Sequence, residues 1–244
     1  MIPGPILGLP GSNYDIDKFP YIGSTETGNP YVFFTSKAAN LDSLDKLRRT
    51  PGIRIGAHSV GHSVYVTARM FAYFLDFKDP KFVVGFNDPE MDVALKNGEL
   101  DGRTSSNVDG VLKDLGDRVQ FHATISNPKG RFDPRLPGLA DLDQFLRNDK
   151  ERNVIDLLRA FQVPRWPHHL SPGTPPELVQ ILREAMEKTF KDPGFRQDFM
   201  KLMGREPTPL TGEEVQKAVR ELPRDAEVIA LYKKLADAGP LPSR

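Results

Sequence analysis

The sequence predicts an α/β protein with a mainly parallel sheet. Between residues 53 and 126, short apolar runs alternate with amphipathic helical stretches. This alternation is typical of strand–helix–strand units with right-handed crossovers. From residue 174 onward the chain instead shows several helix starts in succession. We therefore expect an α/β body joined to a cluster of helices that covers part of a sheet.

Length and composition narrow the class of protein. A chain of 244 residues can bury a sizeable core and can form two lobes. Its 33 basic and 33 acidic residues balance, and no basic run occurs, which argues against nucleic acid as the main partner. The absence of cysteine excludes disulfides, thiol catalysis and cysteine-bound metals. No stretch reaches the roughly 20 apolar residues of a membrane helix, and the first residues lack the pattern of a secretory signal.

The elements follow from local patterns of apolar, turn and capping residues. Strands are expected at 21–22, 31–34, 53–55, 82–85, 100–103 and 119–126, and helices at 41–50, from 64 to 75 and from 88 to 95. Pro51 and Gly52 end the first of these helices, and Gly98 follows the last.

The strongest helix start is in the segment SPGTPPELVQ. Thr174 is a suitable N-cap, Pro175 suits the first helical position, and Glu177 would complete a capping box. The apolar residues that follow are expected to form the face that packs on the rest of the protein: Leu178, Ile181, Leu182, Ala185 and Phe190.

Two more helix starts follow in the same region. Asp192 is expected to cap a helix that ends at Gly204. Thr211 and Glu214 have the spacing of a second capping box, and a last helix is expected near the C-terminus.

The loop GAHSVGHS, residues 56–63, is the first candidate site. It joins a strand to a helix start, so backbone N–H groups and the hydroxyls of Ser59 and Ser63 can converge on a carboxylate or phosphate. An ordinary strand-to-helix turn capped by Ser63 explains the pattern equally well. His58 and His62 have the spacing of a zinc pair but lack the glutamate of HExxH, so no metal is expected.

A second polar cluster, Thr104 to Asn107, follows the expected strand at 100–103. Polar groups at the carboxyl ends of parallel strands are where ligands of α/β proteins bind. A helix cap leading into the next helix is an equally good interpretation.

These segments, taken in order, resemble the solute-binding receptors of the tripartite tricarboxylate transporter family. The similarity lies in ALKNGELDGRTSS, in FDPRLPGLADL, and in the long run from SPGTPPELVQ to LTGEEVQ. It covers essentially the whole chain and is most specific from Gly98 to Val215.

The resemblance implies a type II periplasmic binding-protein fold with two α/β lobes that close on a small carboxylate. Residues 1–34 and 160–244 would form the first lobe, with the C-terminal helices packed on it, and residues 35–159 the second. Carried over by position, the ligand-binding residues would be Ala57, His58, Ser59, Gly61, His62 and Ser63 in one loop, Ser105, Ser106 and Asn107 in the next, and Ser24 and Thr25 in the first lobe.

Two departures from the family are visible. Family members have a further βαβα segment before the strand at Tyr21, so the first lobe is expected to be N-terminally truncated. Asp88 and Glu90 stand where relatives have a glycine-rich turn. These two carboxylates would repel an anionic ligand unless they point away or select a ligand with an amino group or a bridging cation.

The expected function is therefore that of a periplasmic receptor that delivers a small organic carboxylate to membrane permease subunits, without a cofactor and without catalysis. One alternative is a small hydrolase or transferase that uses His58 or His62 as a base. Another is a degenerate fragment that binds no solute and acts only through a protein partner.

Overall fold

The computed structural model describes residues 2–9 and 11–244, which form two compact units. The first unit comprises the chain up to Gly28 together with Asp156–Ile229, and the second comprises Asn29–Ile155 and Ala230–Arg244. The first boundary falls before the strand at residue 31, earlier than the expected boundary at residue 34, because that strand belongs to the sheet of the second unit.

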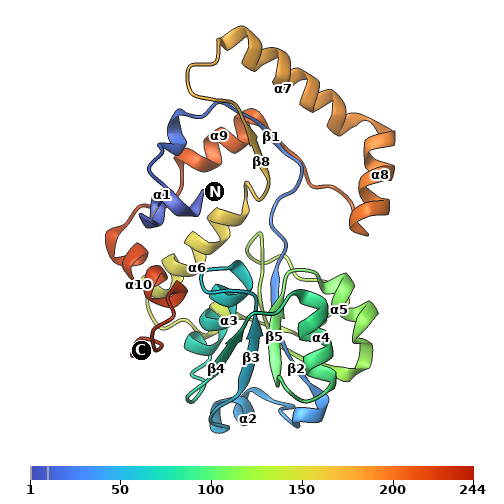
Figure 1. The fold of residues 1–244 in the computed structure, drawn as a ribbon, viewed down its shortest axis with the longest axis vertical. Helices are drawn as coiled ribbons and strands as arrows, with labels where there is room; N and C mark the ends of the chain where they lie inside the picture. The colour runs from blue at the N-terminus through green and yellow to red at the C-terminus, as the bar shows by residue number, and fades with distance from the viewer. Residues whose placement is uncertain (1, 10) are drawn as a thin grey trace. The chain divides into compact units, whose positions relative to one another are not determined.

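The second unit is built on a six-stranded sheet with the order β4-β3-β5-β2-β6-β7 (Figure 1). Its strands are β2 (Tyr31–Ser36), β3 (Arg54–Ala57), β4 (Lys81–Val84), β5 (Gly102–Ser105), β6 (Val119–Ile125) and β7 (Ala140–Asp141). β3 pairs in parallel with β4 and β5, as does β6 with β7, whereas β2 runs antiparallel to both its neighbours. The α/β fold with a parallel-rich sheet is thus confirmed.

The helices of this unit are α2 (Leu44–Arg49), α3 (Ser63–Phe74), α4 (Asp88–Lys96), α5 (Val108–Asp114), the first part of α6 (Asp149–Gln162) and the last part of α10 (Ala226–Ala236). Of these, α3 joins β3 to the parallel strand β4, and α4 joins β4 to β5. Both faces of the sheet are part of the core. Phe33 and Phe71 are fully buried between the sheet and α3, whereas the fully buried Phe34 lies on the opposite face, under the guanidinium of Arg103. The aromatic and aliphatic side chains of α3 are buried along almost its whole length, which explains its apolar sequence.

The C-terminal residues of the chain also belong to the second unit. The buried side chain of Arg69 on α3 donates hydrogen bonds to the carbonyl oxygens of Leu235 and Gly239, both at 2.9 Å. Arg244 donates to Phe74 O at 2.6 Å and to Glu151 Oε2 at 2.8 Å. These contacts place residues 230–244 outside the unit to which the sequence assigned the whole C-terminal region.

The first unit contains a three-stranded sheet with the order β8-β1-β9. β1 (Tyr21–Ser24) pairs antiparallel with β8 (Pro167–His169) and with β9 (Leu210–Thr211), so this small sheet differs from the mainly parallel arrangement expected of both lobes. β8 and β9, which come after residue 160, therefore both run in the direction opposite to β1. The helices of this unit are α1 (Pro3–Leu7), α7 (Pro176–Lys191), α8 (Pro193–Met203), α9 (Gly212–Arg220) and parts of α6 and α10 (Ala226–Ala236).

Two of the three expected helix starts in this unit are confirmed. Asp192 Oδ1 accepts from the N–H of Gly194 at 2.6 Å, and Thr211 and Glu214 form a capping box at α9. The start of α7 was predicted wrongly, because the Thr174 hydroxyl donates to Ser171 O at 2.7 Å and Pro175 is the N-cap residue without a side-chain cap.

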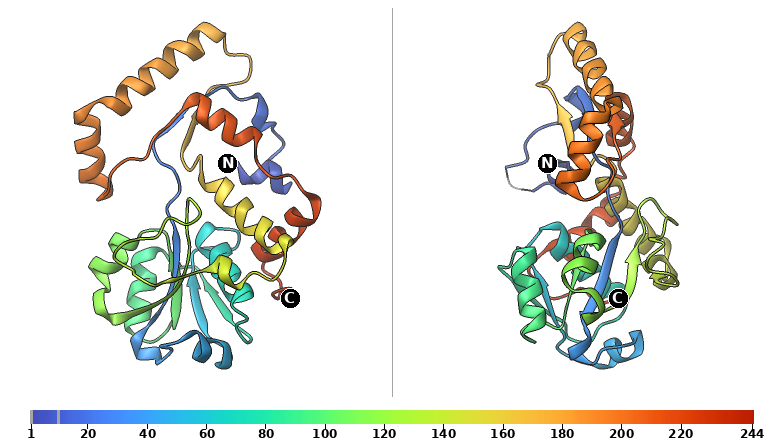
Figure 2. Two further views of the ribbon diagram at one scale, coloured as in Figure 1. Left: turned by 180° about the vertical axis from the view of Figure 1, so that it is seen from behind. Right: turned by 90° about the vertical axis from the view of Figure 1, so that its right-hand side faces the viewer.

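The face through which α7 packs also differs from the prediction. A Cβ atom built on Gly23 of β1 would lie 3.0 Å from Met186 and 3.3 Å from Phe190, and Arg183 Nε donates to Tyr21 O at 2.9 Å. Leu178, Ile181 and Leu182 lie on an adjacent face and are exposed. Of the predicted face, Phe190 lies against β1 at Gly23. Figure 2 shows α7 and α8, in orange, from two further directions.

Candidate functional site

The candidate site lies at the carboxyl ends of β4, β3 and β5, which are neighbours in the sheet of the second unit. Each of these strands leads through a short loop into a helix, so three helix N-termini gather at one sheet edge. This edge is where open α/β sheets bind ligands, because the loops there present backbone N–H groups and short polar side chains.

The loop after β3 leads through residues 58–62 into α3, as predicted. His62 rather than Ser63 occupies the N-cap, and its Nδ1 accepts from the N–H of Val64 at 3.3 Å. Ser59 is exposed and Ser63 is half-buried at the first position of α3. Gly61 has a φ of +80°, a conformation that glycine adopts without strain. The loop therefore presents two hydroxyls beside a helix N-terminus.

Ala57 and His58 tie this loop to the loop after β4. Their carbonyl oxygens accept from the N–H groups of Phe86 at 3.4 Å and Gly85 at 2.7 Å, respectively. Behind them, a Cβ atom on Gly56 would lie 2.4 Å from Cδ1 of Leu100, so glycine at this position leaves room for the Leu100 side chain. The backbone of the loop is thus held from two sides.

The two histidines of the loop stack on each other. The rings of His58 and His62 lie 4.2 Å apart between centroids, and His58 Nε2 lies 4.0 Å from Asp88 Oδ1. Partial desolvation, and secondarily His58, lower the pKa of His62. Within residues 2–9 and 11–244, no group of three histidine or carboxylate side chains is placed to hold a metal ion.

The second polar cluster lies closer to the core than expected. Thr104 and Ser105 are the last residues of β5 rather than part of a loop, because both pair with β2. The buried Thr104 hydroxyl donates to Val64 O at 2.9 Å and so fixes the start of α3 against β5. Thr104 has a structural role in this arrangement.

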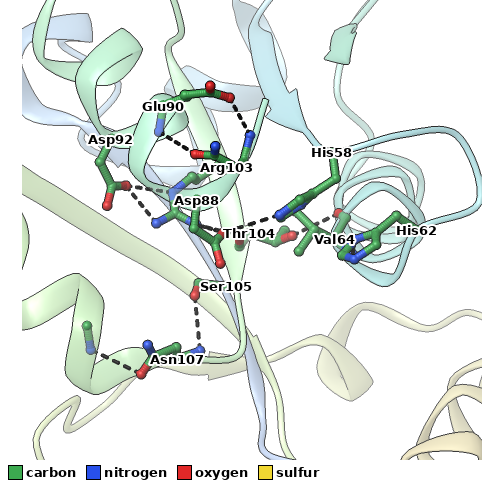
Figure 3. Close-up of polar contacts among 12 residues, drawn as sticks. His58, His62, Val64, Asp88, Glu90, Asp92, Arg103, Thr104, Ser105 and Asn107 are labelled. Carbon is green, nitrogen blue, oxygen red and sulfur yellow. Dashed lines mark hydrogen bonds and ion pairs between the residues drawn. The ribbon is translucent and has the colours of Figure 1, made fainter. Parts of the chain in front are cut away.

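Ser105 and Asn107 organise the start of α5. Ser105 Oγ accepts from the N–H of Asn107 at 3.0 Å, and Asn107 Oδ1 accepts from the N–H of Gly110 at 3.1 Å (Figure 3). Asn107 is exposed and Ser106 is half-buried. The helix-cap interpretation therefore describes Asn107, whose amide group still lies at the same sheet edge as the loop after β3.

Ser24 and Thr25 lie in the first unit, at and just after the end of β1. Ser24 is fully buried and its hydroxyl donates to Glu26 O at 3.0 Å, whereas Thr25 is half-buried.

Glu90 and Asp88 are both engaged by neighbouring groups. Glu90 Oε2 accepts from the N–H of Asn87 at 2.8 Å, and the two residues form a capping box at α4. Asp88 Oδ1 accepts from Arg103 Nη1 at 3.0 Å. Glu90 therefore points into its own helix start, which is one of the outcomes expected for these carboxylates. The charge of Asp88 is matched by the guanidinium of Arg103, an outcome that the sequence analysis did not consider.

Arg103 is the residue that the sequence analysis missed. Its side chain is almost fully buried, donates to Asp92 Oδ1 through Nε at 2.9 Å and Nη2 at 2.6 Å, and lies over the ring of Phe34. Figure 3 shows the guanidinium between Asp88 and Asp92. Burial raises the pKa of Asp92, and the charge of Arg103 offsets part of this effect. One feature of the sequence could have indicated a buried ion pair: Asp92 is a charged residue on the apolar face of α4, between Met91 and Leu95.

Sequence comparison with protein-family models and with curated proteins gives no match. Solved structures do match. A TctC solute-binding protein from Polaromonas, without ligand, has a TM-score of 0.62 at 17% identity, over 95% of this chain and 73% of that one. MatC from Rhodopseudomonas palustris with bound malate has a TM-score of 0.59 at 16% identity, over 95% and 74% of the two chains. An R. palustris protein with adipate has a TM-score of 0.58 at 17% identity, over 93% and 71%.

The fold is therefore that of type II periplasmic binding proteins, and a TctC solute-binding protein is among its structural neighbours. This agrees with the family resemblance seen in the sequence. No helix in the described residues is both long and apolar enough to cross a membrane.

Proposed function

We propose that this protein is a receptor for a small organic carboxylate. The observation that carries the proposal is the loop after β3, where Ser59 and Ser63 flank the N-terminus of the 12-residue helix α3. The first turn of a helix has N–H groups without intrahelical acceptors and a partial positive charge, both of which favour an anion. Neighbours of the same fold hold malate and adipate, which supports this class of ligand.

The ligand-binding residues that we propose lie in two segments of the second unit. They are Ala57, His58, Ser59, Gly61, His62 and Ser63, followed by Ser105, Ser106 and Asn107. For the first unit, Ser24 and Thr25 stay a prediction from the family resemblance. Backbone amides and hydroxyls would hold the carboxylate, because Arg103 is already paired with Asp88 and Asp92. Backbone N–H groups and hydroxyls stay neutral over the physiological pH range, so binding through them does not depend on a change in their protonation.

The wider role that we propose is transport. An extracytoplasmic, periplasmic receptor would present the bound carboxylate to the permease subunits of a tripartite tricarboxylate-type transporter. It would act by binding alone, without a cofactor and without turnover of the ligand. The sequence similarity from Gly98 to Val215 and the fold of the structural neighbours support this role.

Calorimetry on a serine double variant tests the site. First, the chain is titrated with malate, adipate and related acids to find one that binds. Replacing both Ser59 and Ser63 with alanine is then expected to weaken binding by at least about tenfold, since a hydrogen bond to a charged group contributes roughly 1.5–3 kcal/mol.

Ser43→Ala serves as the matched control. Ser43 caps α2, which precedes the amino end of β3 at the opposite edge of the sheet. This variant should leave the affinity unchanged. Unchanged affinity in the Ser59/Ser63 double variant would show that the ligand binds elsewhere, and conversion of the acid during the titration would favour the enzymatic alternative with His58 or His62.

A further inference from the structure

One face of α7 is apolar and exposed. The side chains of Leu178, Ile181 and Leu182 are 48%, 60% and 40% exposed, and Ala185, one turn further on, is exposed as well. The helix packs on β1 through the neighbouring face that carries Met186 and Phe190. In water, such a contiguous apolar stripe on a 16-residue helix favours association with another surface.

The stripe is symmetric along the helix. The spacings from Leu178 to Ile181, Leu182 and Ala185 are three, one and three residues. If two copies of α7 pair antiparallel about a two-fold axis between Ile181 and Leu182, Leu178 lies against the partner's Ala185. In the same arrangement Ile181 lies against the partner's Leu182, so each apolar side chain meets an apolar side chain.

The charges beside the stripe favour the same arrangement. Glu177 and Lys188 are about three helical turns apart and therefore lie on the same flank of α7. Antiparallel pairing places Glu177 near the partner's Lys188, twice by symmetry. A parallel two-fold pair would put this flank of the two helices on opposite sides of the contact and would form no such charge pair. Within the described part of the chain, neither side chain has an ion-pair partner, so both are available for such a contact.

We propose that α7 is a dimerisation surface and that its partner is α7 of a second copy of this chain, antiparallel and two-fold symmetric. The contact is isologous, because the same four apolar residues and the same charge pair contribute from both copies. A surface the size of one helix face lies at the low end of protein–protein interfaces, so the dimer is weak, with a dissociation constant on the order of micromolar.

Sedimentation equilibrium of the full chain, from about 1 to 200 µM, tests the association itself. The expected result is a reversible monomer–dimer equilibrium. Ile181→Glu should abolish the dimer in this range, because it places two carboxylates at the centre of the contact. Val93→Glu is the matched control, since Val93 is 54% exposed on α4, and it should leave the equilibrium unchanged. A monomer at every concentration, or a dimer that tolerates Ile181→Glu, would overturn the proposal.

A charge swap tests the antiparallel register. Glu177→Lys and Lys188→Glu alone should each raise the dissociation constant by about fivefold to tenfold, because each creates two like-charge contacts. The double variant restores opposite charges and should return the constant to within about threefold of the original. Failure of the double variant to recover, with circular dichroism showing the original helix content, would exclude this register.

Discussion

The guanidinium of Arg103 contacts the carboxylate of Asp92 through two hydrogen bonds, with Nε at 2.9 Å and Nη2 at 2.6 Å from Oδ1. Both side chains are buried, and they join β5 to α4 directly below the candidate site. Removal of one member of a buried ion pair leaves an uncompensated charge in a medium of low dielectric constant.

We therefore expect Arg103→Met to lower the free energy of unfolding by about 3–5 kcal/mol, measured by urea denaturation. Asp92→Asn in the Arg103→Met background should recover part of the loss, because it removes the orphaned charge. If the two substitutions were additive, the pair would not be energetically coupled in the way that its geometry indicates.

The stability of the second unit should depend on pH through His122. This side chain is 7% exposed, its Nε2 lies 2.8 Å from Thr35 Oγ1, and burial lowers its pKa to about 4. An unfolded histidine titrates near 6.5, so the unfolded state binds more protons between pH 6.5 and 4. The contribution of neutral His122 is therefore complete above pH 6.5 and is lost as the pH falls toward 4, by about 3 kcal/mol.

Denaturant unfolding at a series of pH values measures this loss. His122→Gln keeps a side chain able to bond to Thr35 but does not titrate, so its unfolding free energy should fall less steeply over the same window. Parallel pH profiles for the two proteins would contradict the assignment.

Two threonines near the starts of α7 and α9 should differ in how much they contribute to the free energy of unfolding. Thr211 Oγ1 accepts from the N–H of Glu214 at 3.2 Å and caps α9, whereas Thr174 caps no helix. Thr211→Ala should cost about 1 kcal/mol of unfolding free energy, and Thr174→Ala less than about 0.5 kcal/mol. Chemical denaturation of the two variants side by side measures the difference. An equal cost would mean that Thr174 is a cap after all.

Glu26 should contribute strongly to the stability of the first unit. It is 1% exposed, it contacts Arg205 Nε, and its Oε2 lies 3.9 Å from Arg165 Nη1. Glu26→Ala is expected to lower the free energy of unfolding by about 3 kcal/mol or more, because two partly buried guanidinium groups lose their counter-ion. The exposed pair of Arg196 and Glu206 is the natural comparison. Glu206→Ala should cost less than about 1 kcal/mol in the same thermal or chemical melt.

Much of the second unit was predictable because its local signals agree with its tertiary contacts. The loop at 56–63, the apolar helix after it and the capping residue Asn87 all carry strong short-range patterns. The position of β2 was less accessible. It enters the sheet between β5 and β6, strands that lie about 70 or more residues further along the chain, and such pairing depends on contacts that no local pattern encodes.

The errors at α7 have a similar physical origin. A proline-rich start with Thr174 satisfies the capping pattern, but the hydroxyl donates to Ser171 O in the preceding turn. Helical periodicity identifies an apolar face, yet it does not say which of two adjacent apolar faces finds a partner within the fold. Arg103 was missed because its partners come from α4 and become neighbours only through the sheet.

The most direct test of the account is a thermal melt of this chain with and without malate, adipate and other small mono-, di- and tricarboxylates. A ligand at about one hundred times its dissociation constant should stabilise the fold by about 2.7 kcal/mol, which is a shift of several degrees. We predict that at least one of these acids raises the melting temperature and that the shift is lost in the Ser59/Ser63 double alanine variant. A cooperative melt that no carboxylate shifts would contradict the proposal that this protein is a carboxylate receptor.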